Sequence, residues 1–281
     1  MSVIAIDLGG TALKGALFQG QITKKRILIP SNGNISSSAI FTALKEAVGA
    51  LDDGNVEKIG LVSAGTIDPE KGVCTYATEN LKGWTGFPIK AELERFFPYP
   101  VYVDNDAIGA LIGEASLLKD PSDVTMLTFG TGVGGASFIH GVLDRSDKTR
   151  WGHYPLHPEG KLCSCGKKGC AEAYLSANAL LLSARELIPG LQGTRELMKL
   201  YDAKDPRASE VLGAYRDDLL LFLKKIEEKI HPTTIILGGG LMDAREVFEP
   251  LVKDACASII FAQLGNEAGL EGARRLPFRS F

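Results

Sequence analysis

The chain has 281 residues, 45% of them hydrophobic and 23% charged, which predicts a globular protein with room for two domains. Its formal net charge of −3 gives no reason to expect nucleic acid as a partner. No apolar run approaches the roughly 20 residues that span a bilayer, and MSVIAIDLGG lacks the layout of a signal peptide. Three of the five cysteines lie close together, unlike a secreted disulfide framework. We therefore expect a cytoplasmic protein, no membrane partner, and reduced thiols that can bind metal.

The first half of the chain alternates apolar runs with turn residues. Short apolar runs predict strands at 2–7, 12–18, 22–29, 58–63 and 101–103. Apolar residues at helical spacing predict helices at 36–51, 91–97 and 106–118. The first three strands follow one another across tight turns, which predicts a meander at the start of a sheet.

The second half repeats this outline. Strands are predicted at 124–129, 136–139 and 233–237, and helices at 171–187, 195–201, 209–230 and 244–261. Strand, glycine turn and strand occur in succession twice, near Gly10 and near Gly132. This pattern favours two similar α/β halves with a cleft between them. We place the domains at 1–104 and 105–281, with a short hinge near residues 103–105 and the last helix able to pack back on the first domain. Three arginines near the end are expected to form a solvated tail: Arg274, Arg275 and Arg279.

Three glycine turns are candidates for binding phosphates, because glycine lets backbone N–H groups approach a phosphate closely. The first, DLGGTALKG, supplies Asp7, Gly9, Gly10, Thr11 and Lys14, and Asp7 could hold magnesium through water. Taken alone, this turn is explained equally well as a plain hairpin. The second turn adds Thr131 and Gly132, and two such loops facing one cleft would clamp a polyphosphate. The third, IILGGGLMDA, supplies Gly239 and Gly240 and suits a nucleoside near a helix N-terminus.

VDNDAIGALIGEA joins a strand to a helix and clusters Asp104, Asn105 and Asp106 at the junction. Helix capping explains at least one of them. An aspartate beside an amide is also suited to binding a sugar hydroxyl and accepting its proton. Phosphoryl transfer needs little beyond positioning, charge neutralisation and such a base, so Asp106 is the candidate catalytic residue.

The stretch GHYPLHPEGKLCSCGKKGCAE combines three cysteines with two histidines. A complete tetrahedral set for structural zinc, with no vacant position for a catalytic water, is offered by His153, Cys163, Cys165 and Cys170. His157 is the alternative fourth ligand, and we prefer His153 because the glycine before it permits a tight approach. The loop is then a clip that orients its two edges, His153 and Glu172.

In this order, these segments resemble the ROK family of bacterial sugar kinases and related repressors. DLGGTALKG and LTFGTGVGG are similar to the two phosphate motifs of the actin/hexokinase-like (ribonuclease H-like) ATPase fold, and IILGGGL to its adenosine motif. NDA matches the family's sugar-binding and catalytic segment, GH…CSCGKKGCAE its zinc signature, and EAGLEGA its closing helix. The resemblance covers nearly the whole chain, and the zinc signature is its most specific part.

The resemblance implies a two-domain α/β protein with an interdomain cleft and a zinc-binding loop. It implies phosphorylation of a hexose or an N-acylated amino sugar, usually on the 6-hydroxyl, with ATP and Mg²⁺. Asp106 would be the base, while Asn105, His153 and Glu172 would contact the sugar, and the three glycine turns would line the phosphates and the nucleoside. Family members are commonly dimers, so a homodimer is expected.

One position departs from the family pattern. Glucose-type members carry an ExGH segment whose glutamate binds the sugar, and Arg150 stands in its place here, in RWGH. An arginine cannot accept a hydrogen bond, so the usual hydroxyl contact must be lost or inverted. Bacterial N-acetylmannosamine kinases also vary at this glutamate, which favours an N-acylated amino sugar over glucose. An anionic sugar that reaches Arg150 is a third option.

Other functions compete with this one. ROK repressors carry an N-terminal helix-turn-helix, whereas this sequence starts at the first strand and has no basic excess. A catalytically inactive sugar sensor is supported only by Arg150 and by a shortened loop before His153. A glucokinase or fructokinase is the alternative among enzymes. Asp106, Lys14 and the two phosphate turns favour an active kinase.

Overall fold

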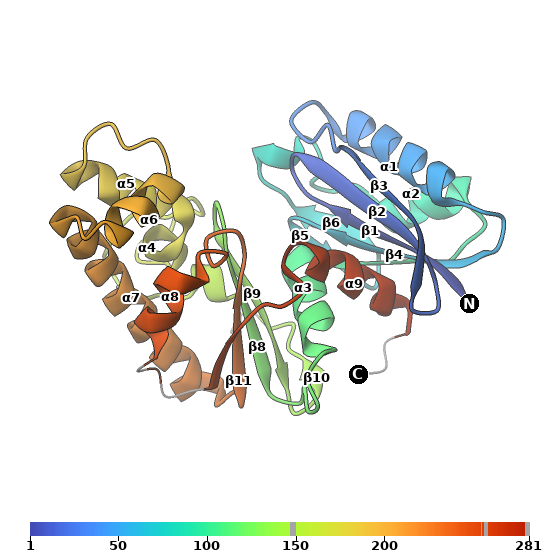
Figure 1. Ribbon diagram of the computed structural model, residues 1–281. Coiled ribbons are helices and arrows are strands. Elements are labelled where there is room, and N and C mark those ends of the chain that lie inside the picture. Colours follow the sequence, from blue (N-terminus) through green and yellow to red (C-terminus); the bar gives the residue numbers. More distant parts are fainter. Residues whose placement is uncertain (147–149, 254, 256–257, 279–281) are drawn as a thin grey trace. The chain divides into compact units, whose positions relative to one another are not determined.

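The computed structural model describes residues 1–146, 150–253, 255 and 258–278. Two units, each with its own five-stranded sheet, make up this structure (Figure 1). Unit 1 comprises Met1–Leu117 and Asn266–Phe281, and unit 2 comprises Leu118–Gly265.

The sheet of unit 1 has the strand order β3-β2-β1-β4-β7. Its strands are β1 (Ser2–Leu8), β2 (Ala12–Gln19), β3 (Ile22–Pro30), β4 (Val56–Ser63) and β7 (Val101–Asn105). The first three are antiparallel neighbours, as the predicted meander requires, whereas β4 is parallel to both β1 and β7. The central strand β1 is buried along nearly its whole length, which explains its continuous apolar run.

Helices cover both faces of this sheet (Figure 1). α1 (Ser37–Leu51) and α2 (Ile89–Phe96) share one apolar core with the strands. α3 (Asp106–Ala115) and α9 (Ala268–Arg275) pack against each other, and α9 also packs on β1 and β4. A small hairpin that the sequence patterns did not predict, β5 (Thr66–Asp68) with β6 (Val73–Tyr76), lies between β4 and α2 in the chain.

The backbones of α3 and α9 are in contact. A Cβ atom on Gly272 would lie 1.9 Å from the carbonyl oxygen of Gly109, and one on Gly113 would lie 2.3 Å from that of Ala268. This packing joins α3 to unit 1, so the chain divides between Leu117 and Leu118 instead of between residues 104 and 105. The packing also places α9 in unit 1, although it follows unit 2 in sequence.

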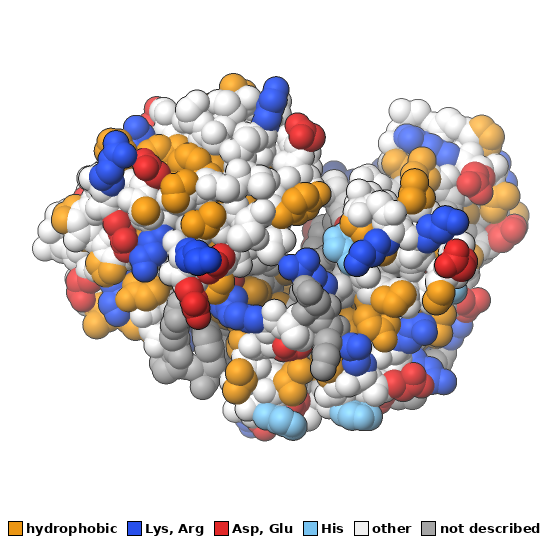
Figure 2. All heavy atoms as spheres, turned by 180° about the vertical axis from the view of Figure 1, so that it is seen from behind, with side chains coloured by type: hydrophobic (Ala, Val, Ile, Leu, Met, Phe, Trp, Pro, Cys, Tyr) orange, Lys and Arg blue, Asp and Glu red, His pale blue; other side chains and the backbone are white. Residues whose placement is uncertain are grey.

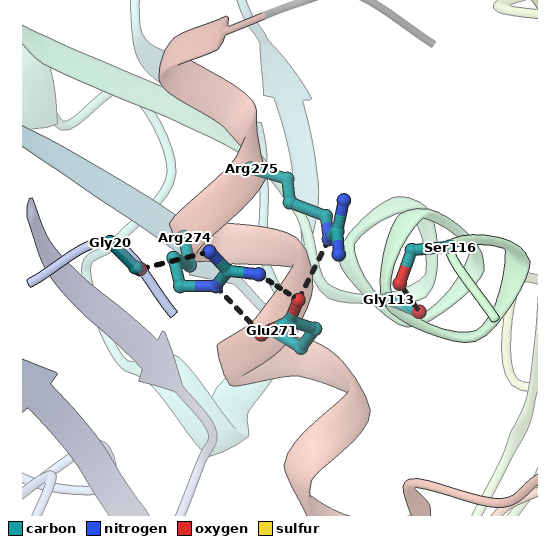
Figure 3. A network of polar contacts seen from close by, with 6 residues as sticks. All are labelled: Gly20, Gly113, Ser116, Glu271, Arg274 and Arg275. Atoms are coloured by element: carbon teal, nitrogen blue, oxygen red, sulfur yellow. Dashed lines mark hydrogen bonds and ion pairs between the residues drawn. The ribbon is translucent and has the colours of Figure 1, made fainter. Parts of the chain in front are cut away.

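The arginines of α9 do not form a solvated tail. Glu271 accepts hydrogen bonds from Arg274 and, at 2.7 Å, from Nε of Arg275. Arg274 also donates to the carbonyl oxygen of Gly20 at 3.2 Å, which anchors α9 to the β2–β3 turn (Figure 3). The expectation for these two arginines is therefore wrong, and Arg279 lies outside the described residues.

Unit 2 has a sheet of the same design, in the order β10-β9-β8-β11-β12. Its strands are β8 (Val124–Phe129), β9 (Val133–Ile139), β10 (Val142–Leu143), β11 (Thr234–Gly238) and β12 (Ser258–Phe261). As in unit 1, an antiparallel hairpin precedes parallel strands in the chain. The helices are α4 (Glu172–Leu175), α5 (Ala177–Leu187), α6 (Thr194–Asp202), α7 (Pro206–Ile230) and α8 (Arg245–Val252). The two similar α/β halves expected from the sequence are thus present in the strand topology.

Two predicted helices differ from the structure. The helix expected at 171–187 is interrupted at Ser176, which is extended and caps α5 by accepting the N–H of Ala179. The helix expected at 244–261 ends at Val252, and the apolar segment SIIF instead adds β12 in parallel to β11. Two isoleucines followed by phenylalanine suit a strand, and pairing with a neighbouring strand overrides the helical spacing.

Basic and acidic side chains are mixed over the face seen in Figure 2, with no large field of one sign. This mixture agrees with the small net charge. Within the described parts of the chain, no helix is both long enough and apolar enough to cross a membrane.

Candidate functional site

The first glycine turn connects β1 to β2 in unit 1. The N–H of Gly9 donates to the carbonyl oxygen of Ala12 at 3.0 Å and closes a tight turn, with Thr11 exposed at its tip. Gly10 packs close to Asn80, since a Cβ atom there would lie 3.1 Å from that of Asn80. The turn therefore presents backbone groups and a hydroxyl in a confined space.

Asp7 and Lys14 face each other across this hairpin. The Lys14 ammonium lies 3.4 Å from Oδ2 of Asp7 and donates to the carbonyl oxygen of Asn266 at 2.8 Å. Burial raises the pKa of Asp7, although the Lys14 charge opposes this effect. The carboxylate is a suitable oxygen ligand for a divalent cation. The predicted contact of Lys14 with phosphate stays a prediction, because its ammonium here binds protein groups.

Asn105 joins the end of β7 to the start of α3. Its Oδ1 accepts the N–H groups of Ala107 at 2.9 Å and Ile108 at 3.4 Å, which caps the helix. Its Nδ2 donates to the Gly65 carbonyl at 2.6 Å and to Oδ1 of Asp106 at 2.8 Å. The amide predicted to contact sugar therefore also fixes the orientation of Asp106.

Asp106 is the first residue of α3, and its side chain reaches solvent, although the surrounding protein removes part of the hydration of its carboxyl group. Loss of hydration, with the nearby negative charge of Asp7, raises the pKa of Asp106 to about 6, against opposing hydrogen bonds from Ala107 and Asn105. Within the described parts of the chain only Oδ1 of Asp106 is hydrogen-bonded. Oδ2 is thus available to accept a proton, and the pKa near neutrality suits a general base.

The second and third glycine turns lie at the ends of neighbouring strands in unit 2. Between β8 and β9, the N–H of Gly130 donates to the Gly132 carbonyl at 2.9 Å, and Thr131 is exposed. Gly239 follows β11 with a φ of 87°, and a Cβ atom there would lie 2.5 Å from the carbonyl oxygen of Phe129. Only glycine allows both the positive φ and this close approach to Phe129. The approach therefore brings the third glycine turn next to the second.

The four predicted metal ligands converge in unit 2. Each of His153, Cys163, Cys165 and Cys170 offers one ligand atom, and these atoms all lie within 4.8 Å of one another. The sulfur of Cys163 is 3.8 Å from Nδ1 of His153, and the sulfurs of Cys165 and Cys170 are 3.7 Å apart. A tetrahedron with Zn–S bonds of about 2.3 Å has edges of roughly 3.8 Å. The donor set therefore fits a zinc ion.

The protonation of these thiols also fits a metal site. Burial, together with the neighbouring sulfurs of Cys165 and Cys163, raises the pKa of Cys170 to about 12. Three crowded thiols therefore do not ionise together near neutral pH without a compensating cation. A bound metal supplies that positive charge and keeps the ligands as thiolates.

The alternative ligand His157 is held elsewhere. Its Nε2 lies 2.6 Å from Oδ1 of Asp218 on α7, and its ring packs on Tyr174 with the centroids 4.7 Å apart. His157 thus joins the loop to α7. Arg150 is exposed and directly precedes the 3₁₀ turn Trp151–His153.

Glu172 lies between the metal-ligand loop and the second glycine turn. Oε2 accepts the N–H of Val133 at 3.1 Å, and Oε1 accepts the hydroxyl of Ser164 at 2.7 Å. The sequence patterns missed Ser164 and Val133, because neither residue type marks a site on its own. The one local signal for Ser164 was its place between two predicted metal ligands, Cys163 and Cys165.

Asp7, Asn105 and Asp106 belong to unit 1, together with the first glycine turn. The metal ligands, Glu172, Arg150 and the other two glycine turns belong to unit 2. Unit 1 therefore carries one of the three predicted glycine turns, and unit 2 carries the other two.

The chain is similar to known proteins over nearly its whole length. The model of the ROK family matches residues 3–277. A glucokinase from Halalkalibacterium halodurans is 30% identical over 313 residues, covering 96% of this chain and 92% of that protein. An N-acetylmannosamine kinase from Vibrio cholerae is 29% identical over 261 residues, covering 90% of this chain and 88% of that protein.

A solved structure shows the same fold. The ROK family glucokinase from Streptomyces griseus, crystallised with glucose and AMPPNP, is 26% identical with a TM-score of 0.79. The match covers 98% of this chain and 99% of that one. The predicted α/β fold of the actin/hexokinase type is therefore confirmed.

Proposed function

The chain belongs to the ROK family, and from that premise we propose that it is a kinase that transfers the γ-phosphoryl group of ATP to a sugar hydroxyl. The observation that carries this proposal is the arrangement of Asp106. Asn105 holds one carboxylate oxygen at the start of α3, and the raised pKa of about 6 gives the group the basicity of a general base. A structural role at a helix start needs no such pKa.

In this proposal, Oδ2 of Asp106 accepts the proton of the sugar hydroxyl while the hydroxyl oxygen attacks the γ-phosphorus. The bond from that phosphorus to the β–γ bridging oxygen breaks, and ADP leaves with the electron pair. Magnesium bound to the nucleotide would neutralise charge on the phosphates, and Asp7 is the candidate carboxylate that holds it. Asp7 stays close enough to act electrostatically on Asp106.

Backbone groups of the glycine turns would receive the nucleotide. Thr131 and Gly132 supply N–H groups and a hydroxyl, and Gly239 with Gly240 forms a surface without side chains for the nucleoside. The glucokinase of known structure was crystallised with AMPPNP, an analogue of ATP, which supports ATP as the donor here.

We propose structural zinc for the Cys₃His set. The ion would cross-link the loop by binding all four side chains. Because four protein ligands complete its coordination, it has no open position for substrate. His153 and Glu172, at the two edges of this loop, are the proposed sugar contacts in unit 2, and Asn105 is the one in unit 1.

The substrate we propose is an N-acylated amino sugar or a hexose, phosphorylated at the 6-hydroxyl. Both substrate classes occur among the relatives, one named glucokinase and one named N-acetylmannosamine kinase. Arg150 favours the amino sugar, because its guanidinium donates hydrogen bonds and an acyl carbonyl accepts them. The second candidate, an inactive sugar-binding ROK protein, is favoured by Arg150 and by the shortened loop before His153.

The test is a coupled ADP-release assay with MgATP and a panel of N-acetylmannosamine, N-acetylglucosamine, glucose, mannose, fructose and allose. We expect one clearly preferred sugar and a loss of roughly 10²–10⁴-fold in turnover for Asp106→Asn. No sugar-dependent ADP release across the panel, with sugar binding retained by calorimetry, would establish the inactive protein instead.

A further inference from the structure

Both oxygens of the Glu172 carboxylate are used by the protein. Oε1 accepts the Ser164 hydroxyl at 2.7 Å from inside the metal-ligand loop, which we define as residues 153–170. Oε2 accepts the N–H of Val133 at 3.1 Å, at the point where the β8–β9 turn ends. Glu172 thus bridges the loop and the turn across 39 positions of sequence.

The turn is shaped to receive this carboxylate. A Cβ atom on Gly132 would lie 2.5 Å from Oε2 of Glu172, closer than any real contact, so a larger residue would displace the acid. The next residue, Val133, gives its N–H to Glu172. Within the described parts of the chain, the N–H groups of Thr131 and Gly132 and the Thr131 hydroxyl donate no hydrogen bond, so they are the groups of this turn that would bind a phosphate.

The residue before the loop, Gly152, also contacts Val133. Gly152 directly precedes the ligand His153, and a Cβ atom on Gly152 would lie 1.8 Å from the carbonyl oxygen of Val133. Glu172 follows the ligand Cys170 by two positions. The residues that flank the metal-ligand loop therefore both contact Val133: Glu172 on its N–H side and Gly152 on its carbonyl side.

From these contacts we propose that Glu172 is a positioning residue, held by Ser164, through which the metal-ligand loop sets the backbone of the β8–β9 turn and so the affinity for nucleotide phosphates. This inference deepens the proposed function and rests on it for the identity of the ligand. Each carboxylate oxygen can accept more than one hydrogen bond, so this role is compatible with a sugar contact by Glu172.

The test uses Ser164→Ala, which removes the hydroxyl from Oε1 and leaves the four metal ligands and Glu172 in place. Ser164→Thr restores a hydroxyl. Ser183→Ala is the matched control, because Ser183 Oγ accepts a hydrogen bond from Lys161 of the same loop at 3.2 Å and does not touch Glu172. All variants are checked for unchanged metal content.

Two quantities are measured without sugar: amide hydrogen exchange at Val133 by NMR and the dissociation constant of MgAMPPNP by calorimetry. For Ser164→Ala we expect Val133 exchange to accelerate and nucleotide binding to weaken, each by about tenfold, the effect of one hydrogen bond to a charged group. Ser164→Thr should return both values toward wild type, and Ser183→Ala should change neither.

Unchanged exchange at Val133 in Ser164→Ala would overturn the inference, as would equal effects of Ser164→Ala and Ser183→Ala. A wild-type protein that does not bind MgAMPPNP would refute the proposed function instead. In that case the exchange rate at Val133 still decides whether Glu172 positions the turn.

Discussion

Replacing Asp106 by asparagine should lower activity and raise stability at neutral pH, both for the same physical reason. The folded protein holds the Asp106 proton more strongly than the unfolded chain, since its pKa is raised from 3.8 to about 6. The free energy of unfolding therefore falls as pH rises between these two values, and the cost is fully present above pH 6. Asparagine cannot ionise and removes this cost.

The magnitude follows from the size of the pKa shift. A shift of about 2 units corresponds to about 3 kcal/mol for a fully desolvated group, at 1.36 kcal/mol per unit. The Asp106 side chain is exposed, so solvent screens much of this penalty. We expect Asp106→Asn to gain about 1 kcal/mol at pH 7.5 and almost nothing at pH 4.

Urea unfolding at the two pH values measures this difference. The matched control is Asp120→Asn, because hydrogen bonds from Ser122 lower the pKa of Asp120 and its replacement should lose stability at pH 7.5. In parallel, kcat/KM of the wild type should rise with pH, reach half of its maximum near the Asp106 pKa of about 6, and level off at higher pH. A flat pH–rate profile, or an Asp106→Asn protein that is less stable than wild type at pH 7.5, would refute the assignment of Asp106 as a catalytic base with a raised pKa.

Three further predictions concern the metal, the helix packing and the substrate. Elemental analysis should find one zinc ion per chain, and Cys165→Ser should lose it. Cys74→Ser is the control and should retain the zinc, because the buried thiol of Cys74 lies outside the cluster. A wild-type protein that keeps its melting temperature without metal would refute the proposed zinc site. Gly272→Ala should cost more than about 2 kcal/mol in urea unfolding because of its contact with Gly109, whereas Gly213→Ala, with open space in the middle of α7, should gain up to about 1 kcal/mol. Similar effects of both changes would contradict the close packing of α3 on α9. Arg150→Glu should raise kcat/KM for glucose relative to the native sugar, and an unchanged ratio would show that Arg150 does not face the substrate.

Much of the fold could be predicted from the sequence, because neighbouring residues determine where many of the strands, turns and helices form. The strand runs and their glycine turns marked both hairpins, and the helical spacing found α1, α3 and α7. Where a segment's partner decided its structure, prediction failed. The segment SIIF became β12 because β11 lies beside it, and Ser176 ended one helix by capping the next.

The candidate site divides in the same way. The three cysteines were predicted from their spacing and His153 from the glycine before it, and the structure brings the four ligand atoms within 4.8 Å of one another. The raised pKa of Asp106 was not visible in sequence, since it arises from hydration lost in the folded protein and from Asp7, which lies 99 positions earlier in the chain. The partner of Lys14 was equally hidden, because the carbonyl group of Asn266 is 252 positions away.

By itself, the sequence determined which chemical groups this protein has and their local settings: glycine turns at strand ends, an amide and a carboxylate at a helix start, and three thiols with an imidazole on one loop. Only the tertiary structure decided that the backbones of α3 and α9 touch, that His157 binds Asp218 on α7, and that Glu172 connects the loop to Val133. The physical reason is distance along the chain. A turn or a ligand spacing is set by neighbouring residues, whereas these contacts form only when packing brings remote segments together.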